Sequence, residues 1–75
     1  MKPLVYRQNR LFKLEVSELP LKARSIPVQN ALYAAIYDEF LDAQINPKYL
    51  NTDLVQRIQA VNDFARQWLI DKGFV

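Results

Sequence analysis

Residues 31–44 read ALYAAIYDEFLDAQ, and this stretch decides how the rest of the chain has to pack. At about 100° per residue, its apolar side chains cover two neighbouring sides of a helix rather than a single stripe. One side holds Val28, Leu32, Ala35, Ile36 and Phe40, and the next holds Tyr33, Tyr37 and Leu41. A helix with one packing neighbour needs only one stripe. The pattern therefore predicts a central helix over residues 27–44, between a second helix and either a sheet or a second subunit.

The same stretch holds no lysine or arginine, and its three carboxylates lie toward its C-terminal end, at Asp38, Glu39 and Asp42. A carboxylate near the negative end of the helix dipole costs up to roughly 1 kcal/mol at an exposed site. Either these acids form a solvated edge or pair with Lys22 and Arg24, or they form an acidic patch that docks an external basic partner. The first interpretation is the simpler one.

A second helix is predicted over residues 51–72. Its apolar positions recur four, three, four and three residues apart, at Leu54, Ile58, Val61, Ala65 and Trp68. This spacing gives one continuous apolar face with polar residues behind it. Asn51 or Thr52 supplies the N-terminal cap, and Gly73 ends the helix in a left-handed conformation, with Phe74 folding back on Leu69 or Ile70. The two helices together predict an antiparallel helical hairpin.

The basic N-terminal part, residues 1–26, has the alternation and the prolines of extended structure. Residues 4–7 and 11–17 are expected to form two short strands joined by a turn at Gln8 and Asn9, because asparagine tolerates positive φ. One continuous extended arm is the alternative. Pro20 and Pro27 disfavour helix at the residues before them, so residues 18–26 are predicted to cross between the elements in an extended conformation.

These elements predict one domain, residues 1–75, of the α+β class and mostly helical. A chain of 75 residues buries only about 60% of its unfolded surface, so a monomer of this size is marginally stable. It has no cysteine for a disulfide and no histidine for a zinc site, yet 51% of its residues are hydrophobic. We therefore expect dimerisation to complete the fold.

The residue types argue against an enzyme. Without histidine or cysteine, the hydroxyls of Ser17, Ser25 and Thr52 have no imidazole to activate them, and a single glycine excludes a glycine-rich phosphate loop. The only carboxylate cluster lies along one helix and does not surround an ion. We expect no catalytic residue, no cofactor and no metal. No apolar run is long enough for a signal peptide or a membrane span, so a soluble, cytoplasmic protein is expected.

Charge separates the two parts of the chain. Residues 1–24 carry six bases and two acids, a net +4, whereas residues 25–75 carry four bases and six acids, a net −2. Arg7, Arg10 and Lys13 alternate with the aromatic residues Tyr6 and Phe12, a pattern compatible with nucleic-acid contacts. Plain core packing of the rings and a solvated strand face explain the same residues.

The leading hypothesis is a small non-enzymatic interaction or regulatory protein (an adaptor, an inhibitor or an accessory subunit) that works through an aromatic-rich helical surface. Its partners would be a second copy of itself and another protein. Buried aromatic residues dominate binding energy, so the expected interface consists of Tyr33, Tyr37, Phe40, Leu41 and Trp68. The alternative is a nucleic-acid-binding transcriptional regulator that uses the basic N-terminal strand.

Overall fold

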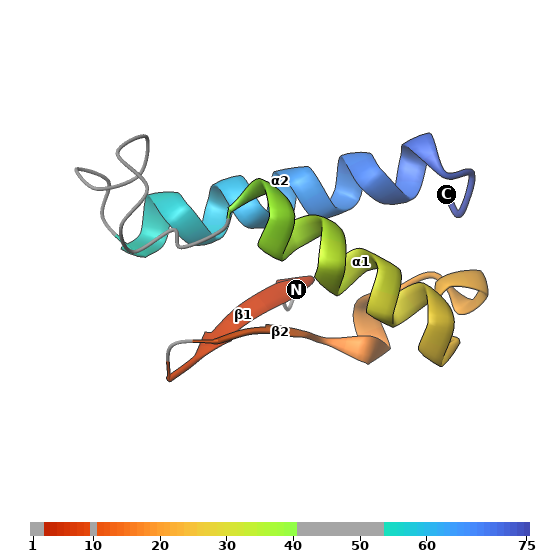
Figure 1. The fold of residues 1–75 in the computed structure, drawn as a ribbon, viewed down its shortest axis with the longest axis horizontal. Helices are drawn as coiled ribbons and strands as arrows, with labels where there is room; N and C mark the ends of the chain where they lie inside the picture. The colour runs from red at the N-terminus through yellow and green to blue at the C-terminus, as the bar shows by residue number, and fades with distance from the viewer. Residues whose placement is uncertain (1–2, 10, 41–53) are drawn as a thin grey trace.

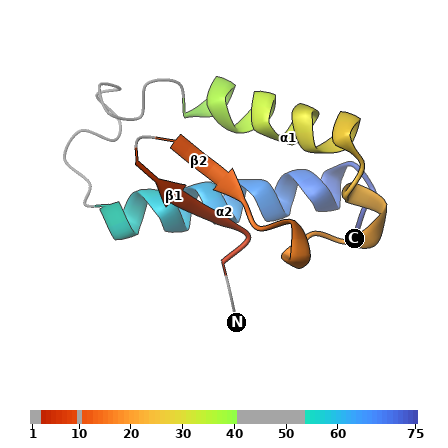
Figure 2. The same cartoon turned by 90° about the horizontal axis from the view of Figure 1, so that it is seen from below.

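The computed structural model describes residues 3–9, 11–40 and 54–75. In chain order the elements are β1 (Val5–Gln8), β2 (Leu11–Leu14), the 3-10 turns η1 (Val16–Glu18) and η2 (Leu21–Ala23), α1 (Ile26–Glu39) and α2 (Leu54–Asp71). The helices run in opposite directions in one layer, and the hairpin lies across them, with β1 along α2 and β2 toward α1 (Figures 1 and 2). The α+β class, the predominance of helix and the helical hairpin are confirmed.

The N-terminal strands form an antiparallel hairpin, so the alternative of one continuous extended arm is wrong. Val5 pairs with Leu14 and Gln8 with Leu11, which puts Gln8 inside β1 and starts the turn one residue later than predicted. Asn9 has φ 57°, in the left-handed region that asparagine tolerates.

Two predictions for the segment after the hairpin are wrong. β2 ends at Leu14 instead of continuing to residue 17, and the crossing segment contains two 3-10 turns instead of extended chain. Proline fixes its own φ and constrains the residue before it, and Leu19 is indeed extended at φ −74° and ψ 146°. The residues after Pro20 are free to turn, and the amide of Ala23 donates to the carbonyl of Pro20 at 2.8 Å.

Helix α1 begins one residue before the predicted start, with Ser25 at the N-cap position and Pro27 in the first turn. The side chain of Ser25 makes no capping hydrogen bond. Ser25 has only the extended backbone conformation of an N-cap residue. Residues 41–44 of the first predicted helix and 51–53 of the second, including both candidate caps, lie outside the described residues.

The end of α2 has the predicted left-handed glycine cap, at Gly73 with φ 83°. The amide of Phe74 donates to the carbonyl of Leu69 at 2.9 Å, and that of Gly73 donates to Ile70 at 3.0 Å. These two bonds are the Schellman arrangement, which satisfies carbonyls at a helix C-terminus. The chain folds back as expected, and the ring of Phe74 stacks on Trp68 at 6.1 Å between centroids.

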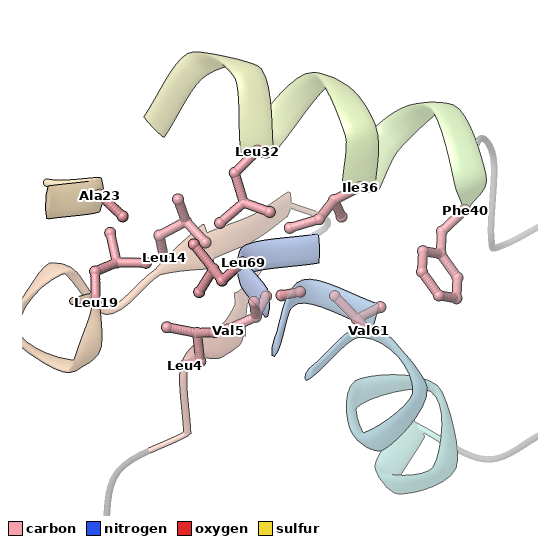
Figure 3. Packing of buried hydrophobic residues seen from close by; sticks show 11 residues of the cluster. Leu4, Val5, Leu14, Leu19, Ala23, Leu32, Ile36, Phe40, Val61 and Leu69 are labelled. Atoms are coloured by element: carbon pink, nitrogen blue, oxygen red, sulfur yellow. The ribbon is translucent and has the colours of Figure 1, made fainter. Parts of the chain in front are cut away.

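The core lies where the hairpin meets both helices (Figure 3). Its members come from both strands, η2 and both helices, but none comes from η1. Helix α2 contacts both α1 and β1, and α1 reaches β2 through the hydroxyls of two tyrosines. The buried hydrophobic residues are Leu4, Val5, Leu14, Leu19, Ala23, Leu32, Ile36, Phe40, Val61, Ala65 and Leu69.

Candidate functional site

The outer edge of β1 is covered by one side chain of α2. Val5 turns its amide and carbonyl away from β2, and the carboxamide of Asn62 meets both. Its Oδ1 accepts from the Val5 amide at 2.8 Å, and its Nδ2 donates to the Val5 carbonyl at 2.8 Å. Nδ2 also donates to the carbonyl of Ile58 at 2.9 Å, and Asn62 is only 8% exposed. The side chain thus makes the pair of bonds that a neighbouring strand would make.

The outer edge of β2 is covered by two hydroxyls of α1. Tyr33 accepts a hydrogen bond from the amide of Leu14 at 2.9 Å, and Tyr37 accepts one from the amide of Phe12 at 2.9 Å. The Tyr37 hydroxyl also donates to the carbonyl of Phe12 at 3.4 Å. An exposed sheet edge is a template for another strand. At Val5, Phe12 and Leu14 this template is occupied from within the chain, which argues against strand addition there.

The described residues of the predicted aromatic interface all make contacts inside the chain. The ring of Tyr37 lies 5.8 Å from that of Phe12, and the buried ring of Phe40 meets Phe64 edge-on at 5.5 Å. Trp68 stacks on Phe74, and the Nζ of Lys72 lies 5.8 Å from the centre of the indole. Leu41 lies outside the described residues. A partner interface at these residues stays a prediction.

The hairpin does not bring the predicted basic contacts to one face. Paired residues of an antiparallel sheet point to the same side, and successive residues alternate. Arg7 pairs with Phe12 and Tyr6 pairs with Lys13, so Arg7 and Lys13 lie on opposite faces. The Nε of Arg7 also donates to the carbonyl of Asn9 at 3.1 Å. Arg10 lies outside the described residues.

The acidic patch is exposed where it is described, at Asp38 and Glu39, and Asp42 lies outside the described residues. Arg24, one of its two expected internal partners, uses its guanidinium elsewhere. Nε donates to the carbonyl of Leu19 at 3.0 Å, and Nη2 donates to that of Ser17 at 3.0 Å. These bonds hold the connection between η1 and η2, so within the described residues the alternative in which Arg24 pairs with Asp38 or Glu39 is not formed.

Sequence reasoning missed the backbone-capping role of Asn62 and the two tyrosines. Asn62 is one of the polar residues of its helix, but it stands four residues after Ile58 and three before Ala65, at the border of the apolar face. An amide at such a border was the available signal. Nothing in the sequence indicated which backbone groups it would meet.

An apolar surface lies at one end of the molecule. Here η1, η2, the start of α1 and the end of α2 come together, as both views show (Figures 1 and 2). Among the described residues, eight large hydrophobic side chains are exposed, and five of them lie in these segments or in the C-terminal residues that follow α2. We call this set the apolar end, and it consists of Val16, Leu21, Ile26, Ile70 and Val75.

An open groove of about 290 Å³ lies within the apolar end. Its floor includes the buried side chains of Leu4 and Leu69, and Ile70 and Val75 add exposed apolar surface. Two charged residues also line it, Glu18 from η1 and Arg66 from α2, and both are exposed. The groove is therefore apolar inside, with one acid and one base on its margin.

Among residues 3–9, 11–40 and 54–75, no group of three or more acidic side chains could hold a metal ion. Within the same residues, no helix is long and apolar enough to cross a membrane. No protein-family model, curated protein or solved structure matches the chain.

Proposed function

We propose that the chain is a small, non-catalytic interaction protein whose binding surface for another protein chain is the apolar end. One observation carries the proposal: the exposed side chains of Ile70 and Val75 line an open groove, and Val16, Leu21 and Ile26 are exposed on the neighbouring segments. Leu21 is 79% exposed, Ile26 65% and Ile70 51%, so each offers apolar area that a partner can still bury. Gathered exposed apolar groups mark interaction sites, whereas scattered ones need no explanation.

This proposal moves the binding surface away from the aromatic residues of the helices. The rings of Tyr37, Phe40 and Trp68 have neighbours within the chain, so a partner would gain less by covering them. The apolar end has no such cover in the described structure. Burial of apolar area contributes roughly 25 cal/mol per Å², and the largest gain lies where that area is still exposed.

A non-catalytic role is supported by the chemistry of the whole chain. It contains no histidine and no cysteine. A binding function needs neither. Nucleic-acid binding, the alternative, would be favoured by basic side chains on one face of the hairpin. Arg7 and Lys13 lie on opposite faces. It would reveal itself as binding that falls steeply with salt through release of counterions.

The experiment that tests the proposal compares proteins bound to the tagged wild type with those bound to two variants. Leu21→Asp combined with Ile70→Asp places two charges on the apolar end, at exposed positions where the fold tolerates them. Val55→Asp places one at the opposite end of α2, where Val55 is also exposed. We expect a protein partner that the wild type and Val55→Asp retain, and that the double variant loses at least tenfold.

Two results would refute this function. Equal retention by the double variant would mean that the partner binds elsewhere. Recovery of nucleic acid instead of protein, with a steep salt dependence, would favour the alternative. Circular dichroism of each variant checks that the fold is intact before the comparison is made.

A further inference from the structure

We infer that the partner in the groove is a second copy of this chain, placed by a two-fold axis so that Glu18 of each copy faces Arg66 of the other. The inference rests on the proposed function, because it names the occupant of the same apolar end. It differs from the dimer expected from the sequence, whose contacts were the aromatic residues of the helices.

The first step is the charge on the margin of the groove. Glu18 and Arg66 line the same groove from different elements, η1 and α2. Both are exposed and carry opposite charges, and the apolar side chains of Leu4 and Leu69 line the same groove. A partner that fits must therefore present one base, one acid and apolar side chains.

The second step is the identity of the partner: a second copy of this chain presents one acid, one base and apolar side chains with the same surface. In a two-fold dimer both subunits use one patch, so a contact from residue i to residue j occurs a second time from j to i. A patch with one acid and one base beside apolar side chains is complementary to its own copy, rotated about an axis midway between the two charges. Two Glu18–Arg66 contacts would then lie beside the apolar side chains, and their formation would fix the orientation of the copies.

The third step is the area around the groove. A standard protein interface buries roughly 800 Å² on each partner, more than one small groove provides. Val16, Leu21 and Ile26 extend the apolar surface on the neighbouring segments. A second copy would cover them as well, and the burial would stabilise a chain that is too short for a large core of its own.

The experiment is a charge exchange read by sedimentation over a range of protein concentrations. Glu18→Arg puts two bases opposite each other in a homodimer, and Arg66→Glu puts two acids there. We expect each single variant to raise the dimer dissociation constant at least tenfold. An equimolar mixture of the two forms only complementary contacts, so it should dimerise like the wild type. The double variant Glu18→Arg/Arg66→Glu should also recover the homodimer.

Asp63→Arg is the matched control, because it makes the same change of charge at an exposed position of α2 that does not line the groove. It should dimerise like the wild type. The inference is overturned if the wild type is monomeric at every concentration, if the single variants dimerise normally, or if neither the mixture nor the double variant recovers. A monomeric wild type whose partner is still lost on Leu21→Asp/Ile70→Asp would refute only the second copy. A monomeric wild type that also has no protein partner sensitive to Leu21→Asp/Ile70→Asp would refute the proposed function too.

Discussion

The outer edge of β1 and the outer edge of β2 expose the same kind of backbone groups, and the two helices cover them by different means. At β1 a single carboxamide, that of Asn62, provides both an acceptor and a donor at a site that is 8% exposed. At β2 the hydroxyls of Tyr33 and Tyr37, two half-buried side chains, accept hydrogen bonds from the backbone amides. The difference teaches that burial, and not the number of bonds alone, decides what each cover contributes. Water can reach the half-buried side chains of Tyr33 and Tyr37 more easily than the buried carboxamide of Asn62.

The largest effect is expected from Asn62→Ala, which leaves the buried amide and carbonyl of Val5 without partners. Each such group costs about 1 to 3 kcal/mol, so we expect a loss of about 3 kcal/mol. The total free energy of unfolding for a chain of this length is roughly 4 to 11 kcal/mol. The urea midpoint measures the loss, and amide exchange should accelerate at Val5.

Asp63→Ala is the control for this change, since it truncates the exposed neighbouring residue of the same helix. Its stability should stay within about 0.5 kcal/mol of the wild type. If Asn62→Ala were equally mild, water would be able to reach the β1 edge, and the contrast between the two edges would disappear.

A smaller effect is expected from Tyr33→Phe and Tyr37→Phe, which remove the hydroxyls and keep the rings. Each change should cost about 1 kcal/mol, because the amide of Leu14 or of Phe12 loses one partner at a part-buried site. Amide exchange should accelerate at Leu14 and Phe12 before it does at Val5. Tyr6→Phe, at an exposed tyrosine of β1, should change neither the stability nor the amide exchange. A double Tyr→Phe variant that loses more than Asn62→Ala would reverse the ranking of the edges.

The smallest effect concerns the turn that both strands share. Asn9 has positive φ, which costs an alanine roughly 1 kcal/mol and a glycine nothing. Asn9→Ala should therefore lower stability by somewhat less than 1 kcal/mol, and Asn9→Gly should leave it nearly unchanged. Because the turn belongs to neither edge, the unfolding temperature should fall. Amide exchange should accelerate equally at Val5 and at Leu14. Preferential exchange at one edge would show that the turn supports that strand alone.

Several parts of this fold could be read from the sequence because they depend on neighbours along the chain. The spacing of Leu32, Ile36 and Phe40 predicted a buried side of α1, and all three are buried. Gly73 predicted the cap of α2, since glycine adopts positive φ without strain. The strands were found by alternation, but the end of β2 was not. It depends on the start of η1, where the amide of Glu18 donates to the carbonyl of Glu15 at 2.9 Å.

The candidate site was less accessible to sequence reasoning. Leu21 and Ile26 are apolar residues beside prolines, and nothing local distinguishes them from core residues. They count as a surface only because the fold leaves them exposed near the end of α2. Arg24 had the opposite outcome: its charge suggested an acidic partner, and the backbone carbonyls of Leu19 and Ser17 took that place.

By itself, the sequence determined the class of the fold, the order of its elements and the apolar sides that had to meet, because periodicity and capping act over a few residues. The tertiary structure decided which side chains would cover the hairpin edges and where uncovered apolar surface would remain. Val5 and Asn62 are 57 residues apart, and their pairing depends on how the hairpin sits on α2. The groove between Glu18 and Arg66 likewise arises only where η1 and α2 meet, which no local pattern encodes.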